Sequence, residues 1–242
     1  MEQLTNNGAL RLDFNKVKAA IQAGGASSLT RERSQYDSGD LSQMAQMIAE
    51  SMCDGKFILD NNNKDVFENF RRWCDGSGEF YAIDPATHQK VAGDPKKGIY
   101  IGGNPGTGKT LFTAIFSRYA SLLNLRWKRV DGSIERLSWT SYFATEICDR
   151  YAKTGDISEI AKTPSLCIQD IGSEPKETIF MGNRKSVIEE LLQQRGERKD
   201  YITILTANYS IEENIYGDRV TSRLHQMCNY YELKGKDRRY GK

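Results

Sequence analysis

The 242-residue sequence predicts an α/β fold, in which a parallel β-sheet carries helices on both faces. Short apolar runs rich in β-branched residues alternate with segments whose apolar residues recur at helical spacing, and this alternation is typical of parallel sheets. The expected strands span residues 98–102, 125–130, 136–139, 165–171, 201–206 and 230–233. Helices are expected from 111 to 123, 141 to 152 and 188 to 195, with one more before residue 230.

A small helical region is predicted ahead of this core, with residues 1–55 forming the region and residues 56–242 the core domain. A helix over 14–23 is followed by a polar linker over 26–38. The next helix is expected to begin at a cap on Asp40, with an apolar stripe of Leu41, Met44, Met47, Ile48 and Met52. A third helix over 64–73 carries Val66, Phe67, Phe70 and Trp73 on one face. Such stripes usually form core, but the Met-rich helix is the best candidate for binding a partner.

Composition sets limits on location and partners. The 34 basic and 32 acidic residues nearly cancel, so any contact with nucleic acid must come from a local patch. The five cysteines are scattered without a C-x-x-C pair, which favours reduced thiols over a metal or redox site. Apolar runs stay well below the ~18 residues of a membrane span, and the first residues do not resemble a signal peptide. We therefore expect a soluble cytoplasmic protein.

A phosphate-binding loop follows the first predicted strand. Residues 103–110 read Gly-Asn-Pro-Gly-Thr-Gly-Lys-Thr and match the pattern G-x-x-x-x-G-K-[ST] in full. Glycines allow backbone N–H groups to surround phosphates, the lysine adds positive charge, and the final hydroxyl is placed to bind Mg²⁺. The sequence thus predicts ATP and Mg²⁺ as cofactors. The expected nucleotide-binding residues are Gly103, Asn104, Pro105, Gly106, Thr107, Gly108, Lys109, Thr110 and Leu111.

Two later strands end in polar residues suited to the same site. Residues 165–174 contain an apolar strand that ends in an acid, Asp170, as a Walker B motif requires, and Asp170 is expected near the metal together with Thr110. An ordinary buried strand that ends at a solvated aspartate is the alternative. The strand at 201–206 leads to Asn208, whose amide is suited to hold water or the γ-phosphate, although an ordinary turn is an equal alternative by pattern alone.

Taken together, the motifs resemble the AAA+ ATPases of the DnaC/IstB type, and most of all the DnaC and DnaI replicative helicase loaders. The resemblance runs from Phe57 to the C-terminus, whereas residues 1–55 are too generic to assign. It implies a P-loop AAA+ core and an oligomer with ATP between subunits. It rests on residues 103–110, 166–174, 206–208, 216–224 and 235–239.

The resemblance also implies roles for individual residues. Asn208 corresponds to sensor 1, and Arg223 to the arginine finger that enters the neighbouring subunit's site, with Arg219 one turn earlier as the other candidate. Arg239 corresponds to sensor 2, a role that Arg238 is also able to fill. The catalytic set is therefore Asp170, Asn208, Arg223 and Arg239.

One position departs from the family pattern. The family places two acids after the Walker B strand, but this chain has Gln169 before Asp170. A neutral amide is a poor ligand for a hard dication, so nucleotide binding is expected to tolerate this change better than hydrolysis does. Glu174 is close enough in sequence to offer a replacement carboxylate.

Three functions remain open from the sequence. The first is a helicase loader that binds a replicative helicase and single-stranded DNA, and the second is a transposition helper of the IstB type, which recruits a transposase on DNA. The third is a nucleotide-gated scaffold with weak hydrolysis. Candidate DNA contacts are residues 126–129 and 234–239 with Tyr230, Tyr231 and Tyr240, since aromatic and basic residues alternate there, although ordinary solvated surface is an equal alternative for each. Ring or filament assembly is also left open.

Overall fold

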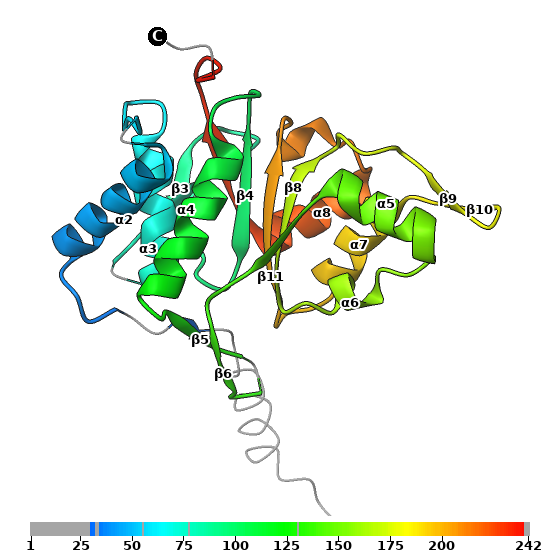
Figure 1. Cartoon of the computed structure of the whole chain (residues 1–242), viewed down its shortest axis with the longest axis horizontal. Coiled ribbons are helices and arrows are strands. Elements are labelled where there is room, and N and C mark those ends of the chain that lie inside the picture. The colour runs from blue at the N-terminus through cyan, green and yellow to red at the C-terminus, as the bar shows by residue number, and fades with distance from the viewer. Residues whose placement is uncertain (1–29, 32–33, 55, 77, 130, 240–242) are drawn as a thin grey trace, which may run out of the picture.

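A five-stranded parallel sheet forms the centre of the molecule (Figure 1). The computed structural model describes residues 30–31, 34–54, 56–76, 78–129 and 131–239, so the helix expected at 14–23 lies outside the described residues. The strands lie in the order β12-β4-β11-β8-β7, and every neighbouring pair is parallel. Their bounds are Gly98–Gly103 for β4, Thr140–Phe143 for β7, Ser165–Ile171 for β8, Ile202–Ala207 for β11 and Cys228–Leu233 for β12.

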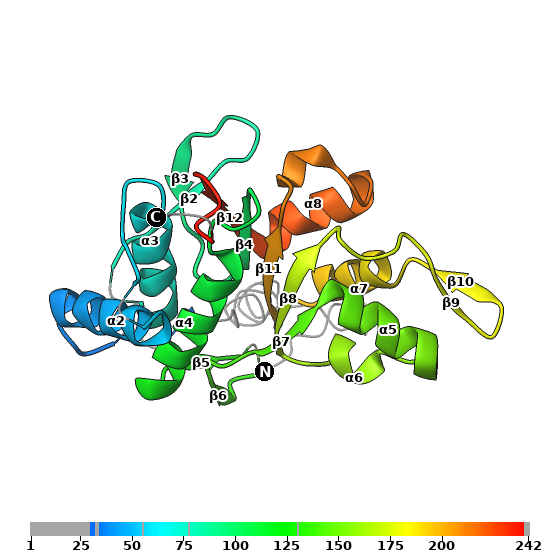
Figure 2. The ribbon, with the colours of Figure 1, turned by 45° about the horizontal axis from the view of Figure 1, so that its top comes forward.

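Helices cover both faces of this sheet, as the sequence predicts (Figure 2). One face carries α2 (Ser38–Met52), α3 (Lys64–Asp75) and α4 (Lys109–Leu122). The other carries α5 (Ala144–Thr154), the short α6 (Ser158–Ala161), α7 (Val187–Gly196) and α8 (Asp218–Met227). The chain leaves β4 through α4 on the first face but leaves β11 through α8 on the second. The crevice between the ends of β4 and β11 is therefore a topological switch point, where ligands of open α/β sheets bind.

The strands form because their side chains are buried on both faces. In β4, Ile99 and Ile101 pack under α4, whereas Tyr100 points to the opposite core. Strand residues alternate in this way because successive side chains point to opposite faces. A strand covered on both sides therefore reads as a continuous apolar run, and this explains why β4, β8 and β11 are evident from the sequence.

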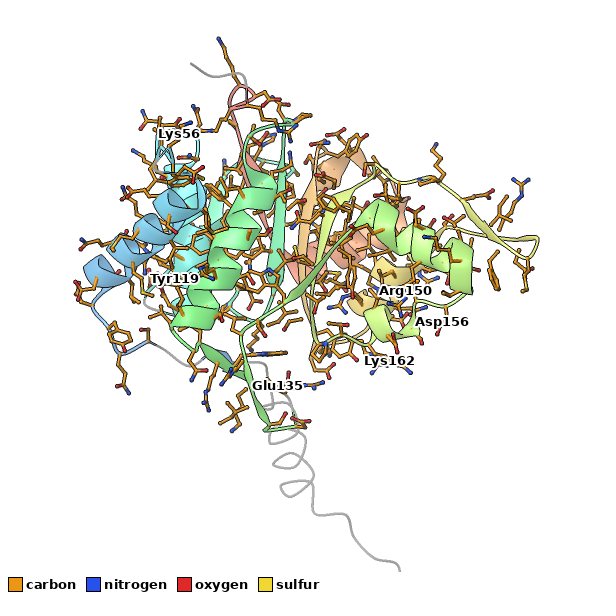
Figure 3. The ribbon with its side chains drawn as sticks, viewed as in Figure 1. Lys56, Tyr119, Glu135, Arg150, Asp156 and Lys162 are labelled. Atoms are coloured by element: carbon orange, nitrogen blue, oxygen red, sulfur yellow. The ribbon has the colours of Figure 1, made fainter. Side chains whose placement is uncertain are left out.

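Aromatic and ionic contacts join α3 to α4. Phe116 of α4 lies with its ring centroid 4.9 Å from that of Phe67 and 4.5 Å from that of Phe70, both on α3. The Tyr119 hydroxyl donates to Asp75 Oδ2 at 2.6 Å, and Arg71 Nη1 donates to the same oxygen at 2.8 Å. Figure 3 marks Tyr119 on α4. These contacts fix the helix that follows the phosphate-binding loop against its neighbours.

The second predicted helix is present, with two corrections. Its N-cap is Asp37, whose carboxylate accepts from Gly39 N at 2.7 Å, so the expected cap at Asp40 is wrong and Asp40 lies inside the first turn. The buried stripe is Leu41, Ala45, Ile48 and Ala49, because small alanines allow close approach to α4, and Met47 and Met52 are exposed. The helix is thus packed on the core, with two methionines facing outward. The division at residue 55 stays a prediction.

Several strands differ from the prediction. Residues 140–143 form β7 rather than the start of a helix, because parallel pairing with β8 outweighs the helical spacing that continues into α5. The strands expected at 125–130 and 136–139 are shorter, and they form a hairpin of β5 (Arg126–Lys128) and β6 (Ile134–Arg136). Part of the expected linker is also a strand, β1 (Thr30–Arg31), which pairs with β5.

Two further hairpins have no counterpart in the prediction. They are β2 (Tyr81–Ile83) with β3 (Lys90–Ala92), and β9 (Thr178–Phe180) with β10 (Asn183–Lys185). A short 3-10 turn, η1 (Ile211–Glu213), leads into α8. None of the helices in the described part of the chain combines the length and apolarity needed to cross a bilayer.

Candidate nucleotide-binding site

A cavity of about 1100 Å³ opens at the crevice between the ends of β4 and β11. The phosphate-binding loop and the start of α4 form its floor through residues 105–111. Residues 56–63 contribute one wall, and the segment 235–239 contributes another. Asp170 and Asn208 also line it, so residues far apart in the sequence converge on the predicted site.

The loop has the backbone geometry that phosphate binding requires. Gly106 and Gly108 have φ angles of 75° and 101°, a region that L side chains rarely adopt. A Cβ on Gly106 would lie 1.9 Å from Asp237 Oδ1, so any other residue there would also displace the Asp237 side chain. Because α4 begins at Lys109, the positive end of its dipole faces the cavity. These residues fit the phosphates of a nucleotide.

Lys109 is held in the loop by three hydrogen bonds. Its Nζ donates to Gly103 O at 2.7 Å and to Asn104 O at 2.8 Å, so these two residues position the lysine without lining the cavity. The third bond runs to Asn208 Oδ1 at 2.9 Å and joins the loop to the end of β11. Burial lowers the pKa of Lys109, which nearby Asp170 opposes and Arg239 reinforces. A bound phosphate opposes that shift, because its charge favours the ammonium form.

Asp170 reaches the cavity through an irregularity in the sheet. The pairing of β8 with β11 shifts between Leu205 and Ala207, so Gln169 and Asp170 together face the single residue Thr206. Asp170 has a φ of 52°, in the left-handed region. Bulges beside active sites commonly redirect a side chain in this way.

Gln169 and Glu174 both lie away from the cavity lining. Gln169 is buried under α4, with 3% of its surface exposed, and its amide contacts Thr113 and Thr206. The Glu174 carboxylate accepts from Gly172 N and from the Tyr216 hydroxyl, so it does not replace the missing acid.

The donors available to Mg²⁺ are few. Among the described residues no group of three or more His, Cys, Asp or Glu side chains is placed to hold a metal ion. The predicted ligands Thr110 and Asp170 both line the cavity. This donor set fits an ion that takes its remaining ligands from phosphate oxygens and water, as Mg²⁺ in nucleotide sites commonly does.

The two arginines near the C-terminus have different surroundings. Arg238 Nη2 donates to Asp60 Oδ2 at 2.7 Å, and Arg238 N donates to Gly106 O at 3.0 Å. Arg238 therefore joins the wall at 56–63 to the phosphate-binding loop. Arg239 also lines the cavity, and its charge acts on Lys109. Both arginines thus line the cavity, and of the two only Arg238 has a side-chain bond to Asp60.

Arg219 and Arg223 lie on α8, outside the lining of this cavity. Their Nη2 atoms are each 3.9 Å from Glu197 Oε1, beyond the end of α7. The Arg223 side chain is 32% exposed and that of Arg219 is 70% exposed. Both therefore face away from the chain's own site, where a neighbouring molecule is able to reach them.

The expected aromatic contacts with DNA are wrong for the described residues. Trp127, Tyr230 and Tyr231 are buried, because alternate residues of their strands point into the two cores. Arg129 is paired with Glu135 and Asp200. Tyr240 lies outside the described residues.

Some lining residues were not foreseen from the sequence. Phe57, Ile58 and Asn62 belong to a loop between α2 and α3 that carries no known motif, and only the fold brings it to the cavity. The Asp60–Arg238 pair joins positions 178 residues apart in the sequence. A turn-forming run of asparagines at 61–63 is the one local signal of a loop there.

Comparison with known proteins finds likeness in structure only. No family model matches the chain, and no curated protein matches it. Several solved structures resemble it, among them three of DnaA. AMPPCP-bound DnaA from Aquifex aeolicus has 17% identity and a TM-score of 0.46, and the match covers 75% of this chain and 50% of that one. The replication initiator DnaA bound to AMPPCP and single-stranded DNA has 16% identity, a TM-score of 0.46 and coverages of 74% and 49%.

The third structure is domain III of the Thermotoga maritima replication initiation protein DnaA, with 16% identity, a TM-score of 0.48 and coverages of 75% and 66%. The chain thus spans about half the length of the first two proteins and just under two thirds of the third. The strand order and the loop after β4 give the chain an α/β P-loop core, with helices α2 and α3 ahead of it.

Replacing Lys109 with methionine is expected to weaken ATP binding by ~10- to 100-fold, because hydrogen bonds to a charged partner contribute ~1.5–3 kcal/mol. Titration calorimetry with a non-hydrolysable ATP analogue measures the change. Lys128→Met, at an exposed lysine on β5, serves as the control and is expected to bind as the wild type does. Equal affinities for Lys109→Met and the wild type would show that the cavity is not the nucleotide site.

Proposed function

We propose that this chain is an ATP-binding AAA+ protein that assembles with copies of itself and acts as a replicative helicase loader. The observation that carries the proposal is the convergence of Lys109, Asp170, Asn208 and Arg239 on one cavity at the switch point of the sheet. The direct bond from Lys109 to Asn208 supports a site in which the sensor strand responds to the γ-phosphate. Mg²⁺ would be held by Thr110 and Asp170, and it would shield the charge on the phosphate oxygens.

A nucleotide-gated scaffold with slow hydrolysis is favoured by one specific observation. The position of the family's first acid holds Gln169, which is buried and directed at Thr113 rather than at the cavity. In that form of the proposal, ATP controls assembly while turnover is slow. Measuring ATP hydrolysis of the wild type, with and without DNA, separates the two forms, because rapid turnover would exclude the scaffold.

The second half of each ATP site would come from a neighbouring copy. Support comes from the position of Arg223 outside its own cavity and partly exposed. An arginine that stabilises charge on a transferred phosphoryl group is worth ~10³ to 10⁵ in rate. Such an arrangement requires a repeating, heterologous contact between subunits, which closes as a ring or continues as a filament.

A mixing experiment tests this shared site. Arg223→Ala and Lys109→Met are each expected to abolish stimulated ATP hydrolysis. Mixed in equal amounts they should regain activity, because about a quarter of the contacts in a random mixture join an intact loop to an intact Arg223. Arg219→Ala, mixed with Lys109→Met in the same way, asks whether Arg219 is the finger instead. Failure of every mixture to recover activity would argue against a site between subunits.

The partner-binding surface is proposed on the outer side of α2. Met47 is 61% exposed and lies opposite the face that packs on α4, and Met52, 38% exposed, lies at the C-terminal end of the helix. Exposed methionines adapt to varied apolar surfaces, and this suits a docking site for a helicase. Helicase and transposase remain separate candidates, and the identity of the protein that co-purifies with the chain distinguishes them.

Met47→Glu is expected to reduce co-purification with a replicative helicase about tenfold, since removing one apolar anchor from an interface costs ~1–2 kcal/mol. Met181→Glu, at an 87% exposed methionine in the β9–β10 turn, is the matched control and should leave it unchanged. Recovery of a transposase in place of the helicase would favour the transposition helper. An equal loss of co-purification in Met47→Glu and Met181→Glu would show that the effect is not specific to α2.

DNA contact is proposed at the β5–β6 hairpin. Arg126 lies directly opposite Arg136 in the ladder, and both are exposed, as is Lys128. Like charges paired across strands are unfavourable, so an anionic ligand would stabilise this arrangement. Figure 3 shows Glu135 of this hairpin at the opposite end of the molecule from Lys56, which lines the nucleotide cavity. Contact would be with the phosphate backbone, since the nearby Trp127 is buried.

The double variant Arg126→Ala/Arg136→Ala is expected to weaken binding to single-stranded DNA and to lower the salt dependence. Each lost phosphate contact reduces the slope of log K against log salt by ~0.7 for single strands. Fluorescence anisotropy at several salt concentrations measures both quantities. Arg150→Ala on α5 is the control, and a slope unchanged by the double variant would exclude the hairpin.

A further inference from the structure

Gln169 takes part in a chain of hydrogen bonds that links three parts of the candidate site. Its Nε2 donates to Thr113 Oγ1 at 2.6 Å, on the side of α4. Its Oε1 accepts from Thr206 Oγ1 at 2.8 Å, on the side of β11. The side chain therefore bridges the helix after the phosphate-binding loop and the strand that leads to Asn208.

The directions of these bonds require an amide. The single proton of the Thr113 hydroxyl is donated to Thr110 O at 2.8 Å, so Thr113 is able only to accept from residue 169. The Thr206 hydroxyl accepts from Asp170 N at 2.9 Å and donates to Gln169. Residue 169 must therefore donate at one end and accept at the other. A carboxylate has no proton to donate, whereas an amide does both.

The chain of hydrogen bonds restrains the irregular backbone at Asp170. Two residues of β8 face one of β11 here, and the Asp170 N–H donates to Thr206 Oγ1 at this irregularity. A non-glycine residue at a φ of 52° carries strain of ~1–3 kcal/mol, which the surroundings must overcome. The Gln169–Thr206 pair supplies such a restraint beside the residue whose carboxylate enters the cavity.

We propose that Gln169 is a positioning residue, which holds the Asp170 bulge and couples it to α4 through Thr206 and Thr113. Gln169, at the position of the family's first acid, would then have a role of its own in positioning Asp170, in addition to removing a metal ligand. This inference rests on the proposed ATP site, because Asp170 is the group that Gln169 would position. It predicts that Thr113, Gln169 and Thr206 act as one unit.

Amide hydrogen exchange tests the bond chain in the absence of nucleotide. Thr206→Val and Gln169→Leu are expected to raise the exchange rate of the Asp170 amide at least ~tenfold, because each removes part of its restraint. Thr203→Val removes a buried hydroxyl from the same strand, one that bonds Arg195 instead, and should leave the Asp170 amide unchanged. The proposal would be overturned if the Asp170 amide exchanged at the wild-type rate in both Thr206→Val and Gln169→Leu. An equal rise in its exchange rate in Thr203→Val would also overturn it.

A double-mutant cycle tests the functional coupling. Gln169→Leu is expected to reduce the gain in ATP affinity that Mg²⁺ provides by ~10-fold, as loss of a residue that orients a metal ligand commonly does. Asp170→Asn should have a similar effect, and the double variant should show no further loss, because Gln169 acts through Asp170. Additive losses would overturn the inference. Wild-type levels of ATP binding by Lys109→Met would instead refute the ATP site, and the exchange experiment would still report on the bond chain.

Discussion

The hydrogen bond between Lys109 and Asn208 is the contact on which the candidate site depends. It joins the start of α4 to the end of β11, and thus connects elements that leave the sheet toward opposite faces. Parallel strands bring their carboxyl ends to one edge, so the lysine and the amide meet without any long loop. The bond also gives the ammonium group a partner inside a mostly buried environment, where an unpaired charge would be costly.

The helices on the two faces of the sheet contribute different features to the candidate site. On one face, α3 packs against α4, the helix that follows the phosphate-binding loop. The contacts include the rings of Phe70 and Phe116 and the buried Asp75. The opposite layer, with α7 and α8, carries the arginines that face outward. A rigid site and an exposed contact surface are thus built on separate faces of one sheet.

The sequence predicts the parts of the fold that carry strong local patterns. Continuous apolar runs identify β4, β8 and β11, and the phosphate-binding loop identifies the crevice, because both depend on residues close together in the chain. It does not predict β7, where pairing with a neighbour decides the structure, or the β9–β10 hairpin. The bulge at Asp170 was also missed, since a shift in register depends on two strands and neither reveals it alone. The wall formed by Asp60 and Arg238 depends on the whole fold in the same way.

The ion pair between Asp60 and Arg238, which joins two walls of the cavity, is a weak contact. The Asp60 and Arg238 side chains are 39% and 33% exposed, and ion pairs in such surroundings contribute only ~0–1 kcal/mol. Separating the Asp60 and Arg238 side chains therefore costs little free energy, whereas α4, which begins at the loop, is held by buried contacts. Salt screens the pair further. The contact between these two walls of the cavity is therefore expected to weaken as the salt concentration rises.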